Sequence, residues 1–300
     1  MKDQRNAGNE PENKMEAGRK QFLVPDFRNS IVNISATLAE FLGAPNRNET
    51  LPILKEELGR GYRTIVFLCF DGLGMYPLRK NLDQTDFLFQ NLRQVLLSTF
   101  PSTTTNATTS LLTNQLPLEH GWFGWSMHFA ALHRNVDIYL GRDSATREAV
   151  SFSDYPLGRA DCYFDHANSD YAVRTVFPPY VPAARQGRNR AFQTAGEFWS
   201  AIEESCRNPG KQFVYAYYPE IDSVMHKYGV SSPEARCAIR EVSCRLKVLH
   251  ESMEDALFIV SADHGQIDVA GYVELYQDET LLDMLEIYPF LEARAPAFLS

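Results

Sequence analysis

The chain has 300 residues, of which 44% are hydrophobic and 22% charged, a composition typical of globular proteins that excludes fibrous and wholly disordered classes. Its formal net charge of -9 at pH 7 argues against binding to a nucleic-acid polymer or an anionic membrane through bulk charge. No apolar run reaches about 18 residues, the length that a membrane-spanning helix requires.

The chain ends and the cysteines bear on the cellular location. Residues 1–20 are almost wholly polar and are expected to form a disordered leader, followed by one domain over 21–300. The N-terminus lacks the apolar core of an export signal. An odd number of cysteines without a CxxC pair predicts reduced, mostly buried thiols in a cytoplasmic protein. The five are Cys69, Cys162, Cys206, Cys237 and Cys244.

The hydrophobic pattern predicts alternating helices and strands. Helical spacing of apolar residues indicates helices over 30–42, 51–58, 192–206 and 233–253. Continuous apolar runs over 64–70, 213–218 and 257–261 indicate strands buried on both faces. The predicted fold class is α/β, with a mostly parallel sheet flanked by helices on both faces. The segment 129–190 is rich in Tyr, Asp, Arg and Pro, and we interpret it as an insertion or lid over the sheet edge.

Acidic residues follow all three predicted strands. Asp71 follows the first strand, Asp222 comes four residues after the second, and Asp263 follows the third. Open α/β sheets place their ligands at this carboxyl edge. His264 is adjacent to Asp263, and His226 stands four residues after Asp222, on the same side if a helical turn begins there. Carboxylate oxygen together with imidazole nitrogen suits Zn2+, and also Mn2+.

A hydroxyl-rich turn over 101–105 leads directly into a segment, 106–113, that can be helical. The start of a helix gathers free N–H groups and the positive end of the helix dipole, so it can bind an anion or stabilise an alkoxide on a threonine. Taken alone, the turn is better explained by Ser and Thr acting as N-caps and turn formers. Together with the acidic residues and histidines, it indicates two-metal hydrolysis at phosphorus.

These motifs, in this order, resemble those of the alkaline phosphatase superfamily, and within it the type I phosphodiesterase and nucleotide pyrophosphatase branch. The resemblance runs from about residue 60 to the end of the chain. The matching positions are Phe70 to Gly72, Phe100 to Thr104 with Thr113 and His120-Gly121 behind them, Asp222 with His226, and Asp263 to Gly265.

The resemblance implies two divalent metal ions and a threonine nucleophile that forms a covalent phosphothreonine-type intermediate. In the family, the nucleophile lies nine residues before the threonine matched by Thr113, which selects Thr104 and leaves Thr103 as the fallback. The implied substrate is a small phosphate ester, either a phosphodiester or a nucleotide pyrophosphate. The expected metal is Zn2+, with Mn2+ as the alternative. Asp71, Thr104, Asp263 and His264 would hold one ion, and Asp222 and His226 the other.

Two departures from the family pattern keep alternatives open. The family completes its second metal site with a later histidine, but none of the seven histidines follows His264. We therefore expect either that the sequence stops before the domain is complete or that the site is defective, as in a non-catalytic binding protein. Trp125 stands where nucleotide pyrophosphatases carry an asparagine that holds the phosphate. We expect its ring either to line the pocket or stack on a base, or to pack in the core. A phosphomonoesterase, phosphonate hydrolase or phosphomutase-like enzyme is therefore the alternative.

The other aromatic and imidazole side chains near these motifs are expected to have structural roles. The tyrosines at 215, 217 and 218 should pack around their strand, and His120 should fix a turn near the site.

Overall fold

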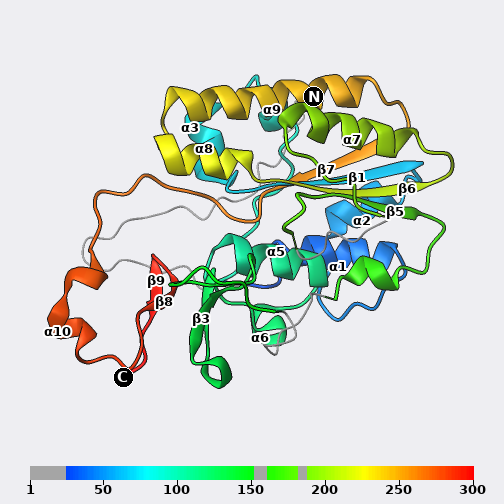
Figure 1. Ribbon diagram of the computed structural model, residues 1–300. Helices are drawn as coiled ribbons and strands as arrows, with labels where there is room; N and C mark the ends of the chain where they lie inside the picture. The colour runs from blue at the N-terminus through cyan, green and yellow to red at the C-terminus, as the bar shows by residue number, and fades with distance from the viewer. Residues whose placement is uncertain (1–24, 152–160, 182–187) are drawn as a thin grey trace.

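The protein is described by a computed structural model that covers residues 25–151, 161–181 and 188–300, so the predicted leader over 1–20 lies outside the described residues. Its centre is a parallel sheet of four strands in the order β5-β6-β1-β7, sandwiched between two layers of helices (Figure 1). The strands are β1 (Thr64–Phe70), β5 (Ala172–Val176), β6 (Gln212–Tyr218) and β7 (Ala256–Ser261).

The two central strands are buried along their whole length, as the unbroken apolar runs predicted. Every residue of β1 and β6 is buried, because alternate side chains enter two separate hydrophobic cores. Phe67 and Cys69 join the core beneath α1 (Val32–Phe41), α2 (Pro52–Leu58) and α5 (Thr104–Thr113). Leu68 and Phe70 join the core beneath α7 (Ala195–Arg207) and α9 (Pro233–Glu251).

The predicted α/β class, parallel sheet and flanking helices are confirmed. The long helix α9 lies between β6 and β7 in the sequence, which is the crossover that a parallel pair requires. Helix α8 (Glu220–Tyr228) follows β6 directly and supplies the helical turn on which the pairing of Asp222 with His226 depended. Helix α5 begins two residues earlier than expected, at Thr104.

A second, antiparallel sheet was not anticipated, and the lid over 129–190 is not confirmed. The order of this sheet is β4-β3-β2-β8-β9, and β5, from within the same segment, is an edge strand of the main sheet. Short strands carry too little periodicity to be separated from loops. Residues 152–160 and 182–187 of this segment lie outside the described residues. The strands are β2 (Ser126–Phe129), β3 (Arg134–Asp137), β4 (Arg142–Asp143), β8 (Phe290–Glu292) and β9 (Ala295–Ala297).

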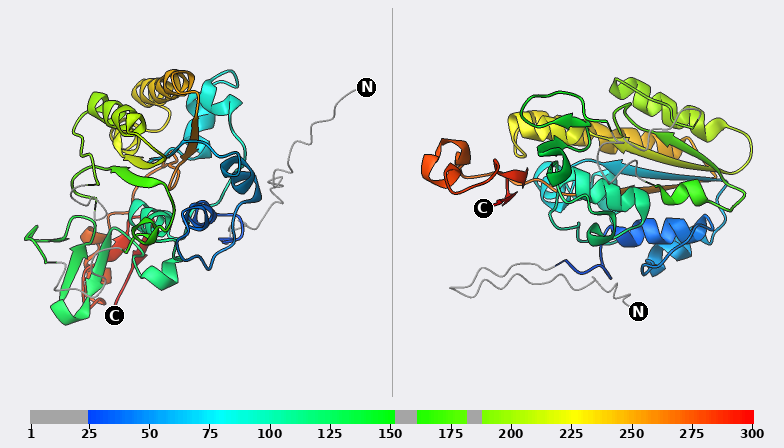
Figure 2. Two further views of the ribbon diagram at one scale, coloured as in Figure 1. Left: turned by 90° about the vertical axis from the view of Figure 1, so that its right-hand side faces the viewer. Right: turned by 60° about the horizontal axis from the view of Figure 1, so that its bottom comes forward.

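The remaining elements are short, and several lie at the periphery. Helix α10 lies away from the main sheet, beyond β8 and β9 (Figures 1 and 2). Of the helices that the structure describes, none combines the length and the apolar character needed to span a bilayer. The short elements are α3 (Met75–Asn81), α4 (Phe87–Gln90), α6 (Pro117–His120), α10 (Glu279–Leu282), and the 3-10 turns η1 (Ala130–Leu132), η3 (Tyr163–His166) and η4 (Leu275–Gln277).

Candidate active site

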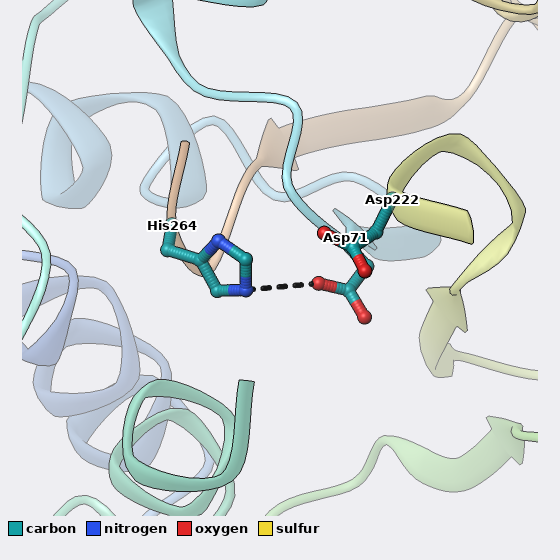
Figure 3. Close-up of side chains that lie close together, drawn as sticks. All are labelled: Asp71, Asp222 and His264. Atoms are coloured by element: carbon teal, nitrogen blue, oxygen red, sulfur yellow. Dashed lines mark ion pairs between the residues drawn. The ribbon is translucent and has the colours of Figure 1, made fainter. Parts of the chain in front are cut away.

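Three neighbouring strands bring the predicted ligands together at one edge of the main sheet. Asp71 follows β1, Asp222 lies in the first turn of α8 after β6, and His264 comes shortly after β7. One ligand atom from each of these three side chains lies within 4.8 Å of the others (Figure 3). His264 Nε2 is 3.2 Å from Asp71 Oδ1. The strand order therefore explains why residues more than a hundred positions apart in the sequence can share one site.

Gly72 allows the chain to turn between these ligands. Its φ of +69° lies in the left-handed region, which residues with a side chain rarely adopt. A Cβ atom at this position would lie 2.7 Å from Asp222 Oδ1. Any larger residue would therefore displace the Asp222 carboxylate from Asp71.

Thr104 is the first residue of α5, and its hydroxyl faces the same cluster. Its Oγ1 lies 3.0 Å from His264 Nε2 and 3.3 Å from Asp71 Oδ1. The Thr103 hydroxyl points elsewhere and donates a 2.6 Å hydrogen bond to Glu292 Oε1. Of the two threonines, Thr104 is thus the one whose oxygen contacts the predicted metal ligands.

Asp263 is the most buried member of the site. Its Oδ1 accepts hydrogen bonds from the backbone N–H groups of Gly72, at 3.1 Å, and of His264, at 2.8 Å. Its Oδ2 is buried and accepts no hydrogen bond from the residues that the structure describes. Burial, together with the nearby Asp71 carboxylate, raises the pKa of Asp263 well above its usual range. A buried carboxylate oxygen that accepts no hydrogen bond is typical of a metal ligand.

The charges around His264 also fit a cation site. Burial disfavours the charged imidazole, but the carboxylates of Asp263, Asp71 and Asp222 together outweigh it and raise the pKa of His264 to about 10. Three carboxylates crowd around this one imidazole, which leaves an excess of negative charge inside the protein. The oxygen and nitrogen donors suit divalent ions such as Zn2+ and Mn2+.

The Asp222 side of the cluster opens to solvent. His226 Nε2 lies 3.3 Å from Asp222 Oδ2, and the His226 side chain is 73% exposed, against 15% for that of Asp222. Burial and the charge of Asp71 raise the pKa of Asp222. The structure therefore brings Asp71, Thr104, Asp263, His264 and Asp222 into one cluster, with His226 beside it at the rim.

The family model described as type I phosphodiesterase / nucleotide pyrophosphatase matches residues 65–296, which include every residue of this cluster. The chain belongs to this family. A comparison with curated proteins found no match.

Two solved structures of a mouse protein share the fold. Ectonucleotide pyrophosphatase/phosphodiesterase 5 from mouse is similar to this chain with a TM-score of 0.54 and 18% identity, in an inactive threonine-to-alanine variant bound to AMP. Another structure of the mouse protein gives 0.51 and 17%. Each likeness covers 72% of this chain, which spans 62% of the mouse protein's length. Phosphonoacetate hydrolase from Sinorhizobium meliloti 1021, in complex with phosphonoformate, gives 0.47 and 19%, over 68% of this chain and 57% of its own.

Two side chains of this family member form hydrogen bonds to the candidate ligands, and sequence reasoning missed both roles. The Tyr217 hydroxyl donates a hydrogen bond to Asp71 Oδ2, and the Gln266 amide donates to Asp222 Oδ1. Tyr217 is the register partner of Cys69, and alternate residues of a strand share a face, so Tyr217 and Asp71 lie on the same side of the sheet. Tyr217 packs in the core around its strand, as expected, and its hydroxyl also contacts Asp71; the strand register would have revealed this contact.

Trp125 and Glu292 lie beside the hydroxyl-rich turn over 101–105. The Trp125 backbone N–H donates a 2.6 Å hydrogen bond to Glu292 Oε1. The half-buried indole packs against the core beneath α5, and its centroid lies 6.3 Å from that of Tyr139. Of the two roles expected for Trp125, the structure therefore shows packing against the core.

His120 fixes the turn after α6, in the manner expected from the sequence. Its Nδ1 accepts a 3.0 Å hydrogen bond from the Trp122 backbone N–H, so Nε2 carries the proton and donates to Ser110 Oγ at 2.9 Å. Burial lowers the pKa of His120 to about 4, and the ring is neutral at pH 7. It holds the segment leading to Trp125 against the middle of α5.

Proposed function

We propose that this chain is a metal-dependent hydrolase of phosphate esters, acting on phosphodiester or nucleotide pyrophosphate bonds, in which Thr104 is the nucleophile. One observation carries the proposal: the Thr104 hydroxyl lies within 3.3 Å of both Asp71 and His264 at the start of α5. In the mouse relative, a threonine-to-alanine variant is inactive and binds AMP. That supports a threonine nucleophile and a phosphate-ester substrate here.

Two divalent ions, Zn2+ in the first instance and Mn2+ as the alternative, are part of the proposal. Asp71, Thr104, Asp263 and His264 would hold one ion, and Asp222 and His226 the other. When bound, such ions lower the pKa of a coordinated hydroxyl and stabilise negative charge on a leaving oxygen. Tyr217 and Gln266 orient Asp71 and Asp222 for this role through their hydrogen bonds.

The protein residues then carry out a double displacement. Thr104 Oγ1 attacks phosphorus, its proton passing to an acceptor such as Asp71 Oδ1, and the bond from phosphorus to the leaving oxygen breaks. The N–H groups in the first turn of α5 face the charge that develops on the phosphoryl oxygens. Water then cleaves the phosphothreonine bond and restores the free hydroxyl.

The test compares two threonine variants of the whole protein with bis-p-nitrophenyl phosphate as substrate and Zn2+ or Mn2+ added. Thr104→Ala should remove metal-dependent turnover, whereas Thr103→Ala should retain it. Full activity in Thr104→Ala with none in Thr103→Ala would move the nucleophile by one residue. No metal-dependent turnover of any phosphate ester by the wild type would overturn the proposed function.

Two alternatives have an observation behind them. Trp125, in place of a phosphate-holding asparagine, favours a phosphomonoesterase, phosphonate hydrolase or phosphomutase-like activity, which a monoester preference in the same assay would select. The open Asp222 side of the cluster, where the His226 side chain is 73% exposed, favours the other alternative, a non-catalytic binding protein with an incomplete metal site, for which we expect at most one tightly bound metal ion and no phosphoenzyme. The cytoplasmic location, which was expected from reduced thiols, stays a prediction. All five cysteines are free thiols, and three of them are buried.

A further inference from the structure

A carboxylate from the C-terminal part of the chain lies beside the nucleophile. Glu292 Oε1 accepts two hydrogen bonds of 2.6 Å, one from the Thr103 hydroxyl and one from the Trp125 backbone N–H. Thr103 immediately precedes Thr104, so the two Cα atoms lie about 3.8 Å apart. The carboxylate is therefore adjacent to the residue that would attack phosphorus.

The backbone fixes the position of this carboxylate. Strand β8 pairs with β2 through Leu291 and Ser126, which are the sequence neighbours of Glu292 and Trp125. Strand β9 pairs with β8 on its other side. Glu292 is thus held in register by a sheet, and both hydrogen bonds to its Oε1 come from residues that directly precede α5 and β2.

Glu292 lies at the N-terminal end of α5, because it accepts its hydrogen bond from the N-cap residue Thr103, and the proposed function places the substrate phosphate at this end of the helix. Thr103 is the N-cap of α5, yet its side chain makes no cap hydrogen bond and is committed to Glu292. Across the described ranges 25–151, 161–181 and 188–300, no lysine or arginine forms a salt bridge with Glu292. The positive helix end stabilises the carboxylate, but no lysine or arginine of the described part of the chain neutralises it.

We propose that Glu292 is a specificity-determining residue that selects phosphodiesters over phosphomonoesters. A monoester phosphate carries a charge of about -1.5 to -2 at pH 7, whereas a diester carries a single negative charge. A fixed carboxylate beside the phosphate repels the additional charge of the monoester, and such like-charge contacts are an effective source of discrimination. This inference rests on the proposed function and narrows its substrate class.

The experiment compares Glu292→Gln with wild type and with a matched control, Glu286→Gln, which removes an exposed carboxylate from the same C-terminal segment. Glutamine keeps an acceptor oxygen for Thr103 and Trp125 while removing the charge. The readout is kcat/KM for p-nitrophenyl phosphate divided by that for bis-p-nitrophenyl phosphate. Glu292→Gln should raise this ratio on the order of tenfold, and Glu286→Gln should leave it unaltered. An unchanged ratio in Glu292→Gln would overturn the inference.

A binding measurement keeps the inference falsifiable if turnover is absent. Calorimetry with the metal-loaded protein should show that Glu292→Gln binds inorganic phosphate, a dianion near pH 8, about tenfold more tightly than wild type. Equal affinities would contradict a repulsive Glu292. A failure of the proposed function would give a different result from a failure of this inference. The wild type would then turn over no phosphate ester, regardless of how tightly either protein binds inorganic phosphate.

Discussion

The two sides of the candidate metal site differ in how they are built. On one side, Asp263 and His264 are buried, and backbone N–H groups of the turns after β1 and β7 hold Asp263 in place. On the other side, Asp222 and His226 occupy the first and second turns of α8, with His226 mostly exposed. The buried Oδ2 of Asp263 receives no hydrogen bond from the described residues and depends on a cation, whereas an exposed imidazole can be hydrated instead. Substitutions should therefore cost far more on the buried side.

The largest effect is expected for Asp263→Asn. Loss of this carboxylate should reduce metal-dependent turnover by roughly a thousandfold or more, because it removes a desolvated ligand that water cannot replace. The metal-free protein should become more stable instead. Since the folded-state pKa of Asp263 is raised, its contribution to stability is present at low pH and is lost as the pH rises. Thermal unfolding of metal-free wild type and variant across pH checks this; a less stable Asp263→Asn would contradict it.

His226→Ala tests the open side. We expect a smaller loss of turnover, roughly a hundredfold, and a fall from two bound metal ions to one in elemental analysis, because water can take the place of an exposed ligand. A loss as large as that of Asp263→Asn would remove the distinction between the two sides.

Tyr217→Phe should have a more moderate effect. Removal of the Tyr217 hydroxyl takes away the hydrogen-bond donor to Asp71 Oδ2. The metal affinity should therefore weaken by about 10- to 100-fold. Tyr218→Phe is the matched control, since Tyr218 lies in the core on the opposite face of the same strand. Metal titration by calorimetry separates a positioning role from simple packing, because a packing defect would lower the melting temperature while leaving metal affinity unchanged.

His120 provides a contrast with His264, since burial keeps its ring neutral. The pKa of His120 in the folded protein is about 4, below its ordinary value of 6.5. Between these two pH values, the unfolded chain binds a proton at His120 and the folded protein does not. The stability from His120 is complete above pH 6.5 and falls as the pH drops towards 4, by on the order of 3 kcal/mol. Urea unfolding near pH 7.5 and near pH 5 should show a smaller pH dependence in His120→Gln. An identical dependence would mean that burial does not set the protonation of His120.

Much of the core and of the buried half of the site could be predicted from the sequence. The apolar runs that became β1, β6 and β7 are long enough to distinguish buried strands from loops, and in parallel sheets their carboxyl ends share an edge. Asp71, Asp222 and Asp263 could therefore be assigned to one site without a structure. The choice of Thr104 over Thr103 came from the family register, and the hydroxyl positions agree with it.

The surroundings of the site were decided by the tertiary structure. Short strands such as β5 and β8 carry no periodic signal, so neither the edge of the main sheet nor the second sheet could be predicted. The Tyr217 contact depends on strand register, and the Thr103–Glu292 contact joins residues 189 positions apart. Local sequence determines which segments are buried and where their polar ends fall. Only packing between distant segments determines which carboxylate lies beside Thr104, because that contact has no local pattern to mark it.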